Sequence, residues 1–248
     1  MFTLAESFQA QRAFVRPGFC WDSADAYLFD IDGTLLNSRD AVHYFSFRNA
    51  VREILGIDAT IDGVPVHGNT DMGIARAVLR RSGLGDEEID AHLPAIMSCM
   101  CAEVARKREE LQPELCVSIL EVVSYLHRKH KLLGVASGNL EPIGWLKLEK
   151  AGLRPMFSFG SFSHPRESRA DIFRHGLDLI AREAGAGATT FIVGDTPSDV
   201  AAARAVGVPV ITLATGIYSF TDLLGCSPDA CFASAAEMIE PRHSTIKT

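Results

Sequence analysis

The chain has 248 residues and a formal net charge of −7, and hydrophobic residues make up 47% of it. This composition is typical of a globular protein with a sizeable core. The acidic total disfavours a duplex nucleic acid as a partner. No apolar run reaches the roughly 18 residues that span a bilayer, and the first residues lack a signal-peptide pattern. We therefore expect a cytoplasmic protein with no membrane partner.

The first predicted strand follows an N-terminal tail. Residues 1 to about 24 are expected to trail from the main body or to pack against it. The run AYLFDID at 26–32 is short and apolar up to its aspartates, which is typical of a strand buried on both faces of a sheet. Gly33 and Thr34 are then expected to turn the chain.

The next part of the sequence, residues 40–112, shows only helical patterns. A helix is predicted over 41–55 with a stop at Gly56, and a second over 70–82 with Asn69 or Thr70 as its N-cap. Residues 86–112 form one long helix or two helices interrupted near Pro94. Because no strand is predicted here, this segment is interpreted as an all-helical insertion.

After Pro113 helices and strands alternate. Helices are predicted over 114–130, 141–152, 168–185, 197–207 and 234–240, and strands over 131–137, 156–160, 189–195, 208–215 and 230–233. Such alternation is typical of a parallel sheet with helices on both faces. We therefore predict an α/β fold in which 1–39 and 113–248 form a Rossmann-like core, and 40–112 a separate helical domain.

Polar residues follow three of the predicted strands. Asp30 and Asp32 end the first, Ser137 ends the second, and Asp195 ends TTFIVGD at 189–195, with Asp199 four residues later. Open parallel sheets bind their ligands outside the carboxyl ends of the strands. Four carboxylates at one edge would repel one another unless they shared a cation, and Mg²⁺ prefers oxygen ligands. The sequence therefore indicates a magnesium site.

Simpler interpretations exist for each motif. Asp32-Gly33 is also a turn sequence, and Asp199 could be only a favourable charge at a helix N-terminus. Ser137-Gly138-Asn139 is also a common loop composition. Asn69, Thr70 and Asp71 could serve only to begin a helix.

Three stretches together resemble a known family. FDIDGTLLNS at 29–38, VASGN at 135–139 and GDTPSD at 194–199 are similar, in order and spacing, to the first, second and fourth motifs of the haloacid dehalogenase-like superfamily. The resemblance covers about Ala26 to Ile239 and is strongest to its phosphoglycolate phosphatase-like group. It implies a HAD-like core with a helical cap domain at 40–112.

The resemblance also implies roles for the acidic residues. Asp30 would be the nucleophile, and Asp32 the general acid and then the base. Asp30, Asp195 and the main-chain carbonyl of Asp32 would bind Mg²⁺, and Asp199 would be a direct or indirect ligand. The remaining core residues implied in binding the substrate phosphate or shaping its loops are Gly33, Thr34, Ser137, Gly138 and Asn139.

The third motif of the family usually supplies a lysine, and here the sequence departs from it. No lysine occurs between Lys150 and Lys247. Arg169, at the start of a predicted helix, is the preferred replacement, and Arg166 is the alternative. An arginine can bind phosphate in a bidentate manner, whereas lysine acts as a point charge.

The predicted cap contains VHGNTDMGI at 66–74, which is similar to a loop that faces the active site in related phosphatases. His67, Asn69, Thr70 and Asp71 are therefore candidates for substrate recognition. Closure of the cap would exclude water during phosphoryl transfer.

These features predict a Mg²⁺-dependent phosphatase that acts on a small phosphorylated metabolite, phosphoglycolate or a similar ester, through an aspartyl-phosphate. A phosphosugar mutase and a non-catalytic HAD-like binding module are the open alternatives. Asp32 argues against a dehalogenase, and the absence of lysine before Lys107 argues against a phosphonate hydrolase. The sequence does not indicate an oligomeric state.

Overall fold

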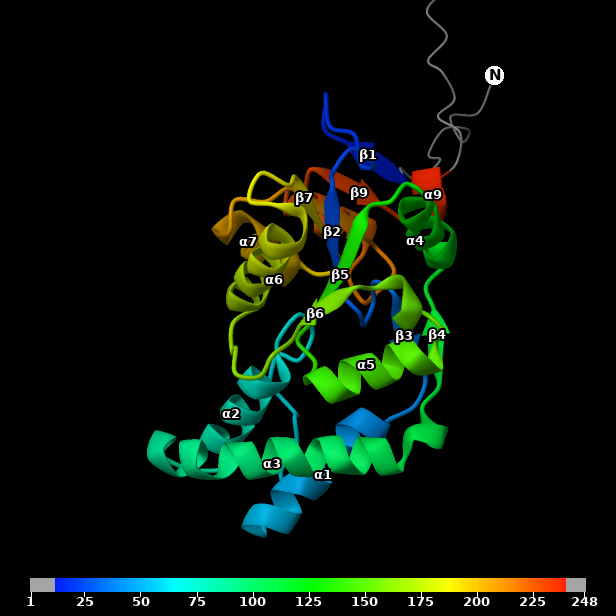
Figure 1. Ribbon diagram of the computed structural model, residues 1–248. Coiled ribbons are helices and arrows are strands. Elements are labelled where there is room, and N and C mark those ends of the chain that lie inside the picture. Colours follow the sequence, from blue (N-terminus) through cyan, green and yellow to red (C-terminus); the bar gives the residue numbers. More distant parts are fainter. Residues whose placement is uncertain (1–11, 240–248) are drawn as a thin grey trace, which may run out of the picture.

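The computed structural model describes residues 12–239, and its centre is a seven-stranded sheet (Figure 1). The strand order is β1-β9-β8-β7-β2-β5-β6, and every neighbouring pair is parallel except β1 with β9. The strands are β1 (Ala13–Val15), β2 (Ala26–Phe29), β5 (Leu132–Ala136), β6 (Phe159–Ser161), β7 (Thr190–Gly194), β8 (Val210–Leu213) and β9 (Ala230–Phe232). The predicted α/β fold with a parallel sheet is confirmed. Strand β1, however, lies within the predicted tail.

Helices cover both faces of this sheet. They are α4 (Ile119–Arg128), α5 (Glu141–Lys150), α6 (Arg169–Ala184), α7 (Pro197–Ala205), α8 (Phe220–Gly225) and α9 (Ala236–Ile239), with short 3₁₀ turns at Arg108–Glu110 and Arg154–Met156. Alternate residues of β2 explain the two layers. Tyr27 and Phe29 pack in one core cluster with α4, whereas Leu28 packs in another with α6 and α7. Burial on both faces is why this strand reads as a continuous apolar run.

Two short strands at the ends of the helical insertion correct one prediction. β4 (Pro113–Leu115) pairs antiparallel with β3 (Leu36–Ser38), and α4 begins only at Ile119. The helix predicted over 114–130 is therefore wrong in its first residues. Pairing with a distant, earlier segment outweighs the local helical pattern, and it brings the two ends of the insertion together.

The insertion folds as three helices, α1 (Val42–Leu55), α2 (Asp71–Arg81) and α3 (Asp86–Arg106). They form a layer of their own beside α5, below the sheet in Figure 1. Their buried side chains make a separate apolar cluster, which Leu140 and Ile143 of the core join. Helix α3 runs without a break through Pro94, so of the two alternatives the single long helix is observed.

Within residues 12–239, no helix is both long and apolar enough to cross a membrane.

Candidate active site

Two neighbouring strands bring the main carboxylates together. β2 and β7 are parallel, with Phe29 opposite Val193, so the residues that follow them leave the sheet at the same edge. Asp30 and Asp195 are both buried there. Each of Asp30, Asp195 and Asp199 offers a carboxylate oxygen, and the three oxygens lie within 4.8 Å of one another. Residues separated by most of the chain therefore share one site.

The turns around Asp195 need glycine. Gly33 has φ +86°, and a Cβ atom on it would lie 2.2 Å from the Oδ2 atom of Asp195. A Cβ atom on Gly216 would lie 1.9 Å from the same oxygen. Thr34 donates a hydrogen bond from Oγ1 to the Asp195 Oδ1 atom at 3.1 Å. Gly33 thus leaves room for the Asp195 carboxylate, and Thr34 holds it by a hydrogen bond.

Arg169 supplies a cation to the cluster. It is the first residue of α6 and is buried, and its Nη2 atom lies 2.9 Å from Asp30 Oδ1 and 2.6 Å from Asp199 Oδ1. Arg166, the alternative, is partly exposed and donates only a long hydrogen bond of 3.5 Å to the Phe162 carbonyl. Of the two arginines, Arg169 reaches the carboxylates.

Asp199 uses both of its oxygens within the protein. Oδ1 accepts a hydrogen bond from Nε of Arg169 at 2.6 Å, and Oδ2 accepts from the main-chain N–H and the hydroxyl of Thr196. Thr196 and Asp199 form a capping box at the start of α7. Asp199 therefore caps a helix and orients Arg169. Because both of its oxygens already accept hydrogen bonds, an indirect role at a metal site is favoured over direct coordination of the metal ion.

The cluster carries more negative than positive charge. Three buried carboxylates face one guanidinium. Burial raises the pKa of Asp30 to about 6, with Arg169 opposing the shift. Burial and the neighbouring charges of Asp30 and Asp199 raise the pKa of Asp195 to about 8. Oxygen donors with uncompensated charge fit a divalent cation, which Asp30 and Asp195 would hold.

Asp32 points to a different partner, Lys147. The Nζ atom of this lysine lies 2.8 Å from both Asp32 oxygens, and Asn139 donates to Asp32 Oδ2 at 2.7 Å. Asn139 also donates to the Ser137 hydroxyl at 2.8 Å. Burial raises the pKa of Asp32, but Lys147 and Asn139 outweigh this effect and lower it overall. Asp32 is thus ionised and held in one orientation.

Sequence reasoning missed Lys147, although a signal was present. Its side chain is 5% exposed, and it lies on the same face of α5 as the buried residues Ile143, Gly144 and Leu148. A lysine in the apolar stripe of a helix requires a charged partner, since an unpaired buried charge is very costly. That partner could not be named from the sequence because α5 contacts the loop after β2 only in the folded chain.

We expect Lys147→Met to lower kcat/KM by roughly 10- to 100-fold, the range typical of residues that orient the groups of an active site. Asp32 would lose its ion pair and its fixed orientation, whereas Lys147→Arg, which keeps the charge, should recover part of the loss. Steady-state kinetics of both variants beside the wild type checks this. Equal activity of Lys147→Met and the wild type would show that Asp32 needs no such support.

The predicted recognition loop joins the helical layer to the core. Thr70 caps α2 by accepting from the Gly73 N–H at 2.9 Å, and its hydroxyl donates to the Glu167 carbonyl at 2.7 Å. Asn69 bonds within its own loop, through its side-chain oxygen to the Thr70 N–H and its amide to the Pro65 carbonyl. Thr70 therefore caps α2 and also bonds to the core, and Asn69 holds the loop before α2.

Asp71 connects the two layers directly. Its main-chain N–H donates to the Gly138 carbonyl at 2.8 Å, and its Oδ2 atom accepts from the Leu140 N–H at 2.7 Å. The same Oδ2 atom lies 3.2 Å from Nε2 of His43 on α1. A Cβ atom on Gly138 would lie 2.3 Å from the Asn69 carbonyl oxygen, so glycine is needed where the layers meet.

A cavity of about 320 Å³ lies between the layers. Predicted residues that line it are Asp30, Asp32, His67, Asn69, Asp71, Ser137, Gly138, Asn139, Arg169 and Asp195. Gly33, Thr34, Thr70 and Asp199 are not among its lining residues. Lining residues that the sequence reasoning did not name include Ser38, Asp40, His43, Tyr44, Val66, Ile74, Lys147 and Thr196.

Comparison with known protein families identifies the family of this chain. A model of the haloacid dehalogenase-like hydrolases matches residues 24–207. The chain belongs to this family. The match spans the helical insertion and the three motifs quoted above, so the predicted family and the predicted hydrolase are confirmed.

This HAD-like hydrolase is similar in sequence to a phosphatase and similar in fold to several solved structures. A phosphoglycolate phosphatase from Synechococcus elongatus is 27% identical over 218 residues, which cover 87% of this chain and 95% of the relative. A mutant of Rhodobacter sphaeroides CbbY, in a complex with xylulose-(1,5)bisphosphate, has a TM-score of 0.64 and 20% identity over 86% of this chain and 96% of its own. A Clostridium difficile β-phosphoglucomutase has a TM-score of 0.61 and 13% identity, covering 86% and 92%. The two structures share the fold of this chain.

Proposed function

We propose that this protein is a Mg²⁺-dependent phosphatase that hydrolyses a small phosphomonoester through a phosphorylated Asp30. One observation carries the proposal: the three buried carboxylates of Asp30, Asp195 and Asp199 face a single guanidinium, that of Arg169. A divalent cation would balance the remaining negative charge of this cluster. A cation beside a carboxylate nucleophile is also what attack on an anionic phosphate ester requires.

The proposed reaction has two steps. In the first, an oxygen of Asp30 bonds to phosphorus, the bond from phosphorus to the ester oxygen breaks, and the alcohol leaves with a proton from Asp32. In the second, water attacks phosphorus, gives a proton to Asp32, and breaks the bond to Asp30, which releases phosphate. The lowered pKa keeps Asp32 ionised in the unliganded protein, which is the form that accepts the proton in the second step. For the first step, Asp32 has to take up a proton when the ester binds.

Other residues bind and orient the phosphoryl group. Arg169 balances the charge of Asp30, and Ser137 and the Gly138 N–H would hold the phosphoryl oxygens beside it. Mg²⁺, when bound by Asp30, Asp195 and the Asp32 carbonyl, would neutralise charge on those oxygens. Asp199 keeps Arg169 in place.

The helical segment 40–112 would act as the cap domain of this enzyme. It has its own apolar cluster and supplies one wall of the catalytic cavity. The Asp71 contacts with Gly138 and Leu140 would hold it closed over the substrate. A closed cap excludes bulk water, which strengthens the electrostatic interactions in the site.

Charge in the cap favours a phosphatase over a phosphosugar mutase. Both enzymes would use Asp30 and Asp32, so the core does not distinguish them. A mutase that passes through a bisphosphate needs a cation for a second phosphate group. Among the described cap residues that line the catalytic cavity, none is a lysine or an arginine.

We expect phosphate release from a panel of phosphomonoesters in the presence of Mg²⁺ and its loss in EDTA, with recovery when Mg²⁺ is added in excess. The reason is that the negative charge of the carboxylates would repel an anionic ester and keep its phosphorus away from Asp30 unless a cation balanced that charge. A phosphate-release assay checks this. Release that EDTA leaves unchanged would contradict the role of the metal, and conversion of a sugar phosphate into its isomer without release would identify a mutase.

A further inference from the structure

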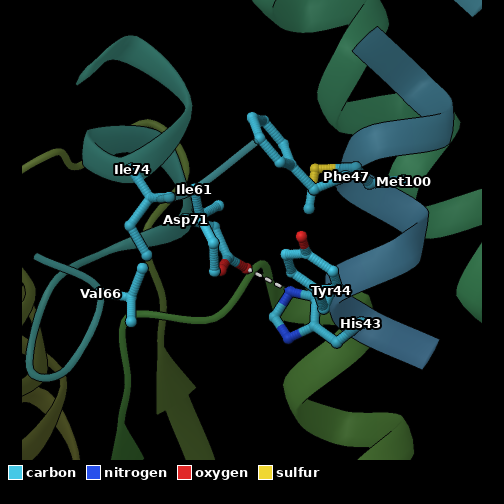
Figure 2. Close-up of a pocket in the computed structure, with 8 residues that line it drawn as sticks. All are labelled: His43, Tyr44, Phe47, Ile61, Val66, Asp71, Ile74 and Met100. Carbon is cyan, nitrogen blue, oxygen red and sulfur yellow. Dashed lines mark hydrogen bonds and ion pairs between the residues drawn. The ribbon is translucent and has the colours of Figure 1, made fainter. Parts of the chain in front are cut away.

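A second cavity, of about 170 Å³, opens beside the catalytic one inside the helical layer (Figure 2). Its apolar walls come from all three helices and the loop before α2: Phe47, Ile61, Val66, Ile74 and Met100. In Figure 2, Phe47 and Met100 lie on the side of α1, and Val66, Ile61 and Ile74 lie across from them. The cavity is thus a largely apolar chamber in the cap.

The two cavities are continuous at their boundary. Five residues line both of them: His43, Tyr44, Val66, Asp71 and Ile74. The catalytic cavity also contains Asp30, the proposed nucleophile. A phosphomonoester whose phosphorus lies against Asp30 would therefore have its leaving group on the side of the apolar chamber.

The described residues at the boundary include one carboxylate and no lysine or arginine. Asp71 stands there beside His43, held by the Leu140 N–H at 2.7 Å and by His43 at 3.2 Å. Neither cavity has a lysine or an arginine from the described part of the cap among its lining residues. The cations that do line the catalytic cavity, Lys147 and Arg169, are ion-paired with core aspartates. A second anionic group on the substrate would meet the Asp71 carboxylate. Among the described cap residues that line the cavities, the groups that could become cations are the imidazoles of His67 and of His43, which Asp71 already contacts.

The size of the chamber limits its occupant. An apolar protein cavity of about 150 Å³ holds a benzene molecule, so 170 Å³ accommodates one ring or a chain of about five carbons. We propose that the leaving group of the substrate is an uncharged, mainly apolar alkyl or aryl alcohol that occupies this chamber. The inference rests on the proposed phosphatase activity and narrows its substrate class. Phosphoglycolate, which carries a carboxylate in that place, would be a poor substrate.

The test compares esters whose alcohols have similar acidity and differ in length or charge. These are methyl, propyl and pentyl phosphate, 2-phosphoglycolate, and the pentyl ester with a terminal carboxylate. Burial of one methylene is worth about 0.8 kcal/mol, or roughly fourfold. We therefore expect kcat/KM to rise with chain length, to roughly 10- to 200-fold for pentyl over methyl phosphate, and to fall at least about tenfold on adding the carboxylate.

A matched pair of variants tests whether the preference for longer alkyl chains arises in the chamber. Ile74 and Leu84 are both partly buried in the cap, but only Ile74 lines the chamber. Ile74→Ala should lower the ratio of kcat/KM for pentyl over methyl phosphate by roughly three- to tenfold, and Leu84→Ala should leave this ratio unchanged. A ratio that both variants change equally would place the apolar preference elsewhere.

Two failures can be told apart. If methyl phosphate is hydrolysed but chain length has no effect, or if phosphoglycolate is the better substrate, the inference is overturned and the phosphatase stands. If no ester is hydrolysed, the proposed function is overturned, and calorimetry with pentylphosphonate and methylphosphonate in Mg²⁺ decides the inference by itself. Tighter binding of pentylphosphonate by about tenfold or more supports the chamber, and equal binding overturns it.

Discussion

Asp30→Asn is expected to lower kcat for every phosphomonoester by roughly 10³-fold or more, because an amide cannot replace a carboxylate as the nucleophile. Asn has nearly the same shape as Asp and removes one negative charge from a crowded, buried cluster. The pKa of Asp30 is already raised to about 6 by burial and neighbouring carboxylates. The fold should therefore tolerate the change, and phosphate release measured in Mg²⁺ reports on the chemistry.

The control for this variant is Asp178→Asn, the same replacement at an exposed aspartate of α6. It should hydrolyse esters at the wild-type rate. Circular dichroism and the thermal midpoint should show that Asp30→Asn is folded. If the folded variant turned over esters as fast as the wild type, Asp30 could not be the nucleophile, and the proposed aspartyl-phosphate would have to be abandoned.

The second large effect is expected at Arg169. Arg169→Ala should lower kcat/KM by roughly 10²- to 10³-fold, the range typical of removing one preorganised group that stabilises transition-state charge. Asp30 and Asp199 would then lose the guanidinium with which they pair. Arg169→Lys should keep part of the activity, because it restores a point charge but not the planar contact that joins Asp30 to Asp199.

Arg166→Ala serves as the matched control, since Arg166 lies three residues earlier and is partly exposed. Its loss removes only a long hydrogen bond to the Phe162 carbonyl, so we expect less than about a threefold change in kcat/KM. Steady-state kinetics of both variants under one set of Mg²⁺ concentrations checks this. A larger loss at Arg166 than at Arg169 would reverse the assignment of the cation.

The α/β fold could be predicted because its signals are local. The strands β2, β5 and β7 are short apolar runs that end in, or are followed directly by, a polar or glycine residue. Asp30 follows β2 and Asp195 follows β7. These carboxylates were expected to lie close together, since the carboxyl ends of neighbouring parallel strands lie at one edge of the sheet. β3 and β4 have no such signal, because their pairing depends on two distant segments.

The residues of the cap loop show where local reasoning reaches its limit. Thr70 and Asp71 were expected to face the substrate or to begin a helix, and in the structure they also connect the cap to the core. Lys147 was not anticipated at all. Its partner, Asp32, is 115 residues away, and nothing near either residue in the chain indicates the other.

By itself, the sequence determined the family, the parallel sheet and the aspartates at its edge, because strand periodicity and compact motifs are carried by adjacent residues. Only the tertiary structure decided which arginine reaches Asp30, that Asp199 orients it, and that an apolar chamber adjoins the site. Those features depend on how helices pack against one another. Packing is set by contacts between residues far apart in the chain, and no short stretch of sequence encodes them alone.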